Sequence, residues 1–97
     1  MHVISRKKLR DFWVIHGDSE SPLTAWYQIA KMADWDSFDR VKETFGKRAD
    51  QAGRFVVFDI GGNKYRLIAA IHYNRGKVYI RHVLTHAEYD LGKWKNG

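Results

Sequence analysis

Residues 54 to 90 contain three short runs rich in β-branched and aromatic residues, separated by two glycine-containing turns. In the second run, apolar residues alternate with the others, which is the period of a strand with one apolar face. Glycine supplies the positive φ that a tight hairpin turn requires. The segment therefore predicts antiparallel strands at 55–60, 65–73 and 77–84, joined by turns at Gly61-Gly62-Asn63 and Asn74-Arg75-Gly76.

The last of these strands runs into a helix start signal. Thr85 and Glu88 have the spacing of a capping box, in which each side chain accepts a hydrogen bond from the backbone amide of the other residue. Such a box satisfies amides that the first turn of a helix leaves without partners. We therefore expect a short C-terminal helix that begins at His86.

The N-terminal half has the spacing of helices, after an expected edge strand at residues 1–4. The expected helix starts are Ser5, Ser21-Pro22, and Asp36 or Ser37, and Gly17 and Gly46 are expected to end the first and third helices. The apolar residues and one histidine that recur at helical spacing are Leu9, Phe12, Trp13, His16, Leu23, Trp26, Tyr27, Ala30, Ala33, Phe38, Val41 and Phe45.

The predicted order of elements is β-α-α-α-β-β-β-α, with residues 47–53 as a polar connection. A chain of 97 residues is expected to form one domain, residues 1–97. The order predicts an α+β fold, an antiparallel sheet with the N-terminal helices packed on one face and a short C-terminal helix. The opposite face is expected to be uncovered and to carry the chemistry.

Turn lengths predict which residues face each other across the sheet. With Gly62-Asn63 as a two-residue loop, Asp59 lies opposite Arg66 and Phe58 opposite Leu67. With Arg75-Gly76 as the second loop, Arg66 lies opposite Thr85 and Ala70 opposite Arg81. The expected apolar face then holds Phe58, Tyr65, Leu67, Ile71, Ile80 and Leu84, and the other face holds Lys64, Arg66 and Arg81. A slip of one residue would invert these faces.

Charge and composition narrow the possible partners. The net charge of +6 and the pI near 9.7 favour nucleic acid or an acidic protein as a partner, although basic residues also serve solubility alone. The chain has no cysteine, which excludes disulfides and thiolate metal sites. It has no apolar run of membrane-spanning length and no segment of signal-peptide type, so we expect a cytoplasmic protein.

Metal chemistry is not expected. His72, His82 and His86 lie on two predicted strands and a helix start, and their spacing matches no common metal motif. His82 is expected to be a core or edge histidine with a hydrogen-bonded nitrogen. The Gly61-Gly62-Asn63-Lys64 turn lacks the strand–loop–helix setting of a phosphate-binding loop. No metal and no other cofactor is predicted.

Cleavage of RNA needs no metal when the 2′-hydroxyl of the substrate attacks the adjacent phosphorus. Arginine can neutralise charge on the phosphorane, and histidine or tyrosine can transfer protons. Arg66, Arg81, His86 and Tyr89 are expected to converge where the last strand meets the helix. Their replacement is expected to leave the fold intact. Alternatively, Arg66 pairs with Asp59, Tyr89 packs under the sheet and His86 only starts a helix.

Longer stretches resemble the HigB family of toxins from bacterial type II toxin–antitoxin pairs, within the wider RelE/ParE-like group. They are VFDIGGNKYRLIAAIHY, VYIRHVLTHAEYD, the opening MHVISRKKLRDF and the central AWY…W…F…VKETFGKRAD. The resemblance covers almost the whole chain. It implies a ribosome-dependent mRNA endonuclease that halts growth, and a helix-turn-helix (HigA-like) antitoxin that masks it.

For such an enzyme we expect further residues to bind RNA without taking part in the chemistry, namely Asn63, Lys64, Arg54, Lys77, Lys7 and Lys8. Their phosphate contacts would set affinity through counterion release. Two other functions are left open. One is a poison of DNA gyrase, as in the ParE branch of the group, and the other is an RNA-binding module without catalysis that uses aromatic residues as stacking platforms.

Overall fold

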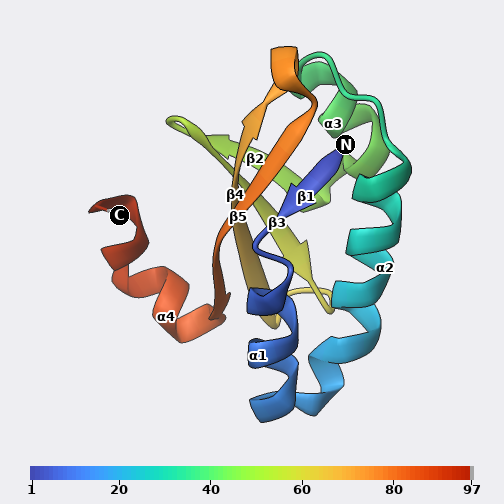
Figure 1. The fold of residues 1–97 in the computed structure, drawn as a ribbon. Helices are drawn as coiled ribbons and strands as arrows, with labels where there is room; N and C mark the ends of the chain where they lie inside the picture. The colour runs from blue at the N-terminus through green and yellow to red at the C-terminus, as the bar shows by residue number, and fades with distance from the viewer. Residues whose placement is uncertain (97) are drawn as a thin grey trace.

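The computed structural model describes residues 1–96, and it confirms the predicted α+β class (Figure 1). A five-stranded sheet has the order β1-β5-β4-β3-β2. The strands are β1 (His2–Ile4), β2 (Ala49–Ala52), β3 (Phe55–Ile60), β4 (Tyr65–His72) and β5 (Lys77–Thr85). The helices are α1 (Lys7–Ile15), α2 (Glu20–Met32), α3 (Phe38–Phe45) and α4 (His86–Leu91). Short 3-10 segments are η1 (Gly17–Ser19), η2 (Gly46–Arg48), η3 (Tyr73–Arg75) and η4 (Lys93–Asn96).

The sheet is mixed, where an antiparallel sheet was predicted. β1 lies at one edge, as expected, but it pairs with β5 in the parallel direction, with His2 beside Lys77. β2 forms the other edge, within the segment predicted to be a polar connection. The strand was not predicted because its residues Asp50 and Gln51 are polar. An edge strand pairs through its backbone and tolerates exposed polar side chains.

Two of the three N-terminal helix starts also differ from the prediction. Ser5 does not cap α1 through its side chain. Its φ is 70° and its backbone carbonyl accepts from the Lys8 amide at 3.0 Å. α2 begins at Glu20, so Pro22 lies within its first turn, where a missing amide costs little. α3 begins after Ser37 and ends at Gly46, which confirms those boundaries.

The register of the first hairpin is confirmed, since Asp59 faces Arg66 and Phe58 faces Leu67. The turn itself is not the expected two-residue loop. Strand pairing stops at Ile60 and Tyr65, and the residues with positive φ are Gly61 at 63° and Gly62 at 71°. Asn63 lies outside the strand pairing and accepts hydrogen bonds from the Arg66 side chain.

The predicted register of the second hairpin is wrong. Ala70 faces Tyr79, two residues before the predicted Arg81, because the turn contains η3 and Gly76. Further along, Ala69 faces Ile80 but Ile68 faces His82, so Arg81 is the extra residue of a β-bulge.

These two shifts have different effects on the faces of the sheet. The turn shift of two residues keeps each side chain on its predicted face, but the bulge shift of one residue does not. Arg66 consequently faces Leu84 and not Thr85. Leu84, predicted for the apolar face under the helices, packs instead with Ile68 and Trp94 on the opposite face.

The three N-terminal helices cover one face of the sheet, as predicted (Figure 1). Trp26 of α2 and Phe45 of α3 both make edge-on ring contacts with Phe58 of β3, at 5.4 and 5.0 Å between centroids. These rings anchor the helical layer, because aromatic pairs add geometric preference to their large buried area.

The opposite face is not uncovered, which corrects the prediction. α4 and η4 fold back across it (Figure 1), and Trp94 of η4 is only 4% exposed. Trp94 packs there with Phe55, Val57 and Ile68 in a second apolar cluster. The C-terminal segment thus builds a small second core beside the predicted site.

Candidate functional site

The start of α4 is fixed by the capping box that the sequence predicts. The Glu88 amide donates to Thr85 Oγ1 at 3.2 Å, and the Thr85 amide donates to Glu88 Oε1 at 2.9 Å. His86 is therefore the first residue of α4, and its Nδ1 lies 2.9 Å from Asp90 Oδ2 one turn later. His86 is exposed, so a carboxylate orients an imidazole that solvent and substrate can reach.

Arg66 lies beneath α4 and is only 8% exposed. Its Nε is 3.2 Å from Asp59 Oδ1, which confirms the alternative that these two residues pair. Nη1 donates to the carbonyls of Asn63 and Tyr65, and Nη2 donates to Asn63 Oδ1 at 2.6 Å. These partners occupy most of the five N–H groups of the guanidinium. The Arg66 side chain is a buried, fixed charge with little capacity left to grip a phosphate.

Tyr89 joins this charge to the C-terminal segment. The Arg66 guanidinium carbon is 5.2 Å from the centroid of the Tyr89 ring, within the range of cation–π contact. The Trp94 ring stacks on Tyr89 at 5.2 Å with 10° between the planes, and Trp94 Nε1 donates to the Tyr89 carbonyl at 3.0 Å. The position of Tyr89 is thus set by Arg66 and Trp94 together.

Trp94 and the pairing of Asn63 with Arg66 were not predicted from the sequence. A signal for Trp94 exists in the printed sequence, since a single tryptophan follows the helix-ending Gly92 among lysines. Gly92 has a φ of 73°, a left-handed conformation that ends α4 and turns the chain back.

Arg81, the fourth predicted catalytic residue, lies elsewhere on the same side of the sheet. It is four residues before Thr85 on β5, which at about 3.3 Å per residue is roughly 13 Å along the strand. It lines an open hollow of about 640 Å³ with Arg54, His72 and Asn74. The structure thus joins Arg66 to Tyr89, places His86 on the same short helix, and puts Arg81 in a neighbouring concavity.

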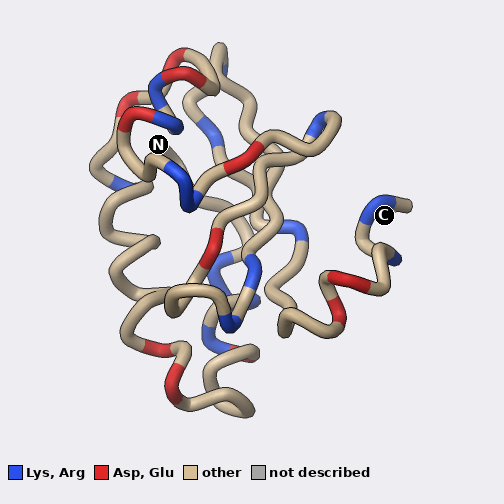
Figure 2. The backbone as a smooth tube through the Cα atoms, turned by 180° about the vertical axis from the view of Figure 1, so that it is seen from behind, with Lys and Arg blue, Asp and Glu red and all other residues tan. Residues whose placement is uncertain are grey.

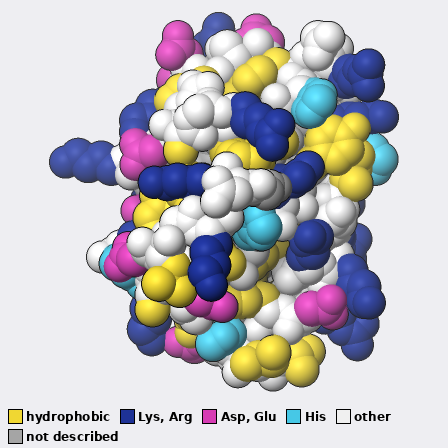
Figure 3. Space-filling model, turned by 90° about the vertical axis from the view of Figure 1, so that its left-hand side faces the viewer, with side chains coloured by type: hydrophobic (Ala, Val, Ile, Leu, Met, Phe, Trp, Pro, Cys, Tyr) yellow, Lys and Arg dark blue, Asp and Glu magenta, His cyan; other side chains and the backbone are white. Residues whose placement is uncertain are grey.

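The predicted RNA-binding residues are spread over several elements. Figure 2 shows Lys and Arg along the whole chain, and Figure 3 shows basic side chains bordering apolar patches on the face that carries α4. Arg54 is exposed, with its guanidinium 5.0 Å from the centroid of the Phe55 ring. Lys8 Nζ donates to the Arg81 carbonyl at 3.1 Å, which ties α1 to the bulge. Lys7 is exposed on α1, and Lys77 lies at the far end of β5 beside β1.

Lys64 is held by an acidic residue of η1. Its Nζ is 2.8 Å from Asp18 Oδ2, and the Tyr65 hydroxyl donates to the other Asp18 oxygen. The hydrogen bonds from Lys64 and Tyr65 lower the pKa of Asp18 below its ordinary value of 3.8. Lys64 is therefore partly neutralised on the surface, which weakens the case for it as an RNA contact.

A pH prediction follows from the lowered pKa of Asp18. A carboxyl group with a depressed folded-state pKa contributes stability above its unfolded pKa and loses it as the pH falls through the folded pKa. We therefore expect Asp18→Asn to melt below wild type at neutral pH, and the difference to disappear in strong acid. Melting curves over a pH series measure this. A difference that persists unchanged below the folded pKa would contradict the assignment.

His82 lies in β5 and is partly buried. Its Nε2 is buried and has no hydrogen-bond partner within residues 1–96. Burial lowers the pKa of His82, and the positive charges of Lys8 and Arg81 lower it further. Within the same residues, no three His, Asp or Glu side chains are grouped as metal ligands, and no helix is long and apolar enough to cross a membrane.

Comparison with known proteins gives one consistent match. The family model for the HigB toxin, described as a RelE-like toxic component of a toxin–antitoxin system, matches residues 19–92. The chain is 29% identical over 93 residues to the mRNA interferase toxin HigB of Escherichia coli K12, covering 94% of this chain and 89% of that protein. It is 26% identical over 92 residues to the mRNA interferase HigB of Escherichia coli O6:H1, covering 93% and 89%. The resemblance stated from the sequence is confirmed: the chain belongs to the HigB toxin family, and a toxin of this kind has an antitoxin as its partner.

Proposed function

We propose that the protein is an mRNA endonuclease that cuts messages on translating ribosomes and so inhibits translation. The observation that carries the proposal is the match, over more than nine tenths of the chain, to relatives named mRNA interferases. The exposed imidazole and the phenol on α4, set above a buried arginine, are groups that can serve such a reaction.

The proposed chemistry uses the 2′-hydroxyl of the message as the nucleophile. The oxygen attacks the adjacent phosphorus and loses its proton, the bond to the 5′-oxygen breaks, and that oxygen gains a proton. The products are a 2′,3′-cyclic phosphate and a 5′-hydroxyl. His86 and Tyr89 handle the two proton transfers, because imidazole and phenol are side-chain groups that accept or donate protons in general acid–base catalysis.

The two arginines contribute in different ways. Arg81 meets a neighbouring phosphate of the message from the adjacent hollow, where a planar guanidinium matches two phosphate oxygens. Arg66 contributes a fixed positive charge from beneath Tyr89 and holds that ring in place. No metal is required, because these groups carry the protons and the charge.

The proposed partners are the ribosome, the message and a HigA-like antitoxin with a helix-turn-helix DNA-binding domain. A basic protein with a net charge of +6 suits both rRNA and an antitoxin that is acidic where it touches the toxin. Action on ribosomes places the protein in the cytoplasm.

Mapping the 5′ ends of mRNA tests the proposal. Purified protein added to a translating extract should give new 5′ ends phased with codons. The result should be the same with a chelator that binds transition metals and leaves the magnesium of the ribosome in place. The same protein mixed with naked RNA in EDTA should cut little, because a site without a strong base depends on the ribosome to orient the substrate. Efficient cutting of naked RNA that EDTA abolishes would contradict both the ribosome and the metal-free chemistry.

A further inference from the structure

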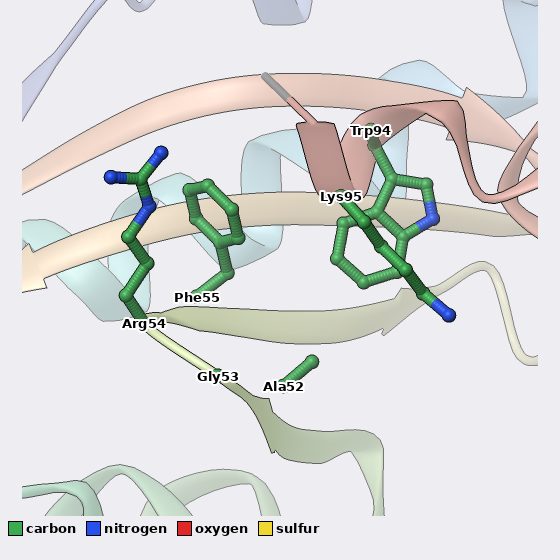
Figure 4. Close-up of a pocket in the computed structure, with 6 residues that line it drawn as sticks. All are labelled: Ala52, Gly53, Arg54, Phe55, Trp94 and Lys95. Atoms are coloured by element: carbon green, nitrogen blue, oxygen red, sulfur yellow. The ribbon is translucent and has the colours of Figure 1, made fainter.

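A second concavity is lined in part by Trp94, whose ring also stacks on Tyr89. It is a hollow of about 340 Å³ lined by Ala52, Gly53, Arg54, Phe55, Trp94 and Lys95. Figure 4 shows the rings of Phe55 and Trp94 side by side above Ala52, with Arg54 beyond Phe55 and Lys95 in front of Trp94. The volume is at the lower end of the range of small-ligand sites, about 300–1,000 Å³.

The hollow combines an aromatic lining with exposed cations. The Phe55 and Trp94 rings meet edge to face at 6.3 Å between centroids. Arg54 lies over Phe55 at 5.0 Å, and Lys95 Nζ lies 5.7 Å from the Trp94 centroid. Both cations are exposed, whereas Phe55 and Trp94 are each only 4% exposed. A base therefore reaches the rings only where Arg54 and Lys95 turn aside toward its phosphates. Aromatic rings beside cations are the features with which proteins hold single-stranded nucleic acid.

The hollow also shares a residue with the surroundings of Tyr89. Trp94 presents one part of its ring to Phe55 and the hollow, and it stacks on Tyr89 at 5.2 Å. Trp94 therefore contacts Tyr89 and also lines the hollow, so one indole ring is shared by the two. A strand with its reacting phosphate at Tyr89 can place a nearby base beside Trp94.

We infer that this hollow is a base-binding subsite for single-stranded RNA, in which a base near the cleaved bond lies against Phe55 and Trp94 and its phosphates meet Arg54 and Lys95. The inference rests on the proposed function, because it assigns the RNA to the substrate. The aromatic lining favours RNA over an acidic protein segment, because the two cations would attract either one but only a nucleic acid offers a base to the rings between them.

The test measures binding without cleavage. The probe is a short fluorescent oligonucleotide whose 2′-hydroxyls are methylated, compared with the same backbone without bases. Wild type should bind the base-containing probe between about fivefold and a hundredfold more tightly, the range expected from stacking on aromatic residues. Equal affinities would overturn the subsite and leave the hollow to a partner protein.

Ala52→Phe fills the hollow and changes no charge. It should remove the preference for bases and leave the affinity for the abasic probe unchanged. Gln51→Phe is the matched control, because neighbouring residues on a strand point to opposite faces and Gln51 is exposed. Both variants must melt near wild type. A base preference that survives Ala52→Phe would contradict the assignment of the lining.

Arg54→Ala and Lys95→Ala should weaken both probes and lower the salt dependence of binding by about 0.7 per lost phosphate contact. Lys31→Ala, which removes an exposed cation on α2, is the control and should do neither.

The outcomes separate the endonuclease proposal from the subsite proposal. Base-dependent binding without cleavage of mRNA on ribosomes would contradict the endonuclease proposal and leave the subsite proposal standing. Cleavage with the same cut sites and affinities in Ala52→Phe would sink the subsite alone.

Discussion

Replacing His86 with alanine is expected to abolish growth arrest while the protein still melts near wild type. The imidazole is exposed and pairs with Asp90 on the same helix, so its loss leaves the packing of the sheet intact. Losing a proton-transfer group costs roughly a hundred- to ten-thousandfold in rate. Induced expression in cells, followed by purification and thermal melting, measures both effects.

Tyr89→Phe is expected to have the same two effects, loss of growth arrest and a melting temperature near wild type. It removes only the hydroxyl, so the ring that contacts Arg66 and Trp94 remains. His2→Ala and Tyr79→Phe, at other places on the surface and sheet, are matched controls and should keep full toxicity. Normal toxicity of both site variants at normal stability would remove the residue-level support for the nuclease. DNA damage at gyrase in those cells would then favour the ParE-like alternative.

Replacing Arg66 with alanine is expected to lower the free energy of unfolding and also to abolish toxicity. This departs from the expectation that every site variant keeps its fold, because Arg66 proved to be buried beside Asp59 and Asn63. Removing one partner of a buried ion pair costs about 3–5 kcal/mol, since the other charge is left uncompensated. Asp59 is partly exposed, so we expect the low end of that range, measured by urea unfolding.

The double variant Asp59→Ala with Arg66→Ala separates the cause. If the cost of Arg66→Ala comes from the stranded carboxylate, the double variant should be more stable than the sum of the two single losses predicts. Additive losses would show that Arg66 stabilises the fold through its contact with Tyr89 and its bonds to the turn, independently of Asp59.

Local signals in the sequence predicted what neighbouring residues decide. Thr85 and Glu88 fixed the start of α4 because a capping box needs only two suitable residues three positions apart. The first hairpin register followed from its glycines, and it brought Asp59 opposite Arg66. Family resemblance added the toxin class, which no periodicity could give.

Features decided by distant parts of the chain were not predicted. The bulge at Arg81 depends on how β5 fits between β1, β4 and α1, with Lys8 bonded to its carbonyl. β2 gains its hydrogen bonds only once β3 is in place. Trp94 finds its cluster only after Gly92 turns the chain back over the sheet. Because of the bulge, Arg81 lies outside the predicted cluster. Because of Trp94 and its neighbours, the face that was expected to be open is covered.

The extra residue in β5 also decides on which side of the molecule the C-terminal helix emerges. Side chains on a strand alternate, so one residue more or fewer rotates everything downstream by half a turn. Deleting the bulge residue would direct Thr85 and His86 toward the layer occupied by α1 and α2. A designer who grafts this site onto another sheet must therefore keep the number of residues between the hairpin and the capping box, or change it by two.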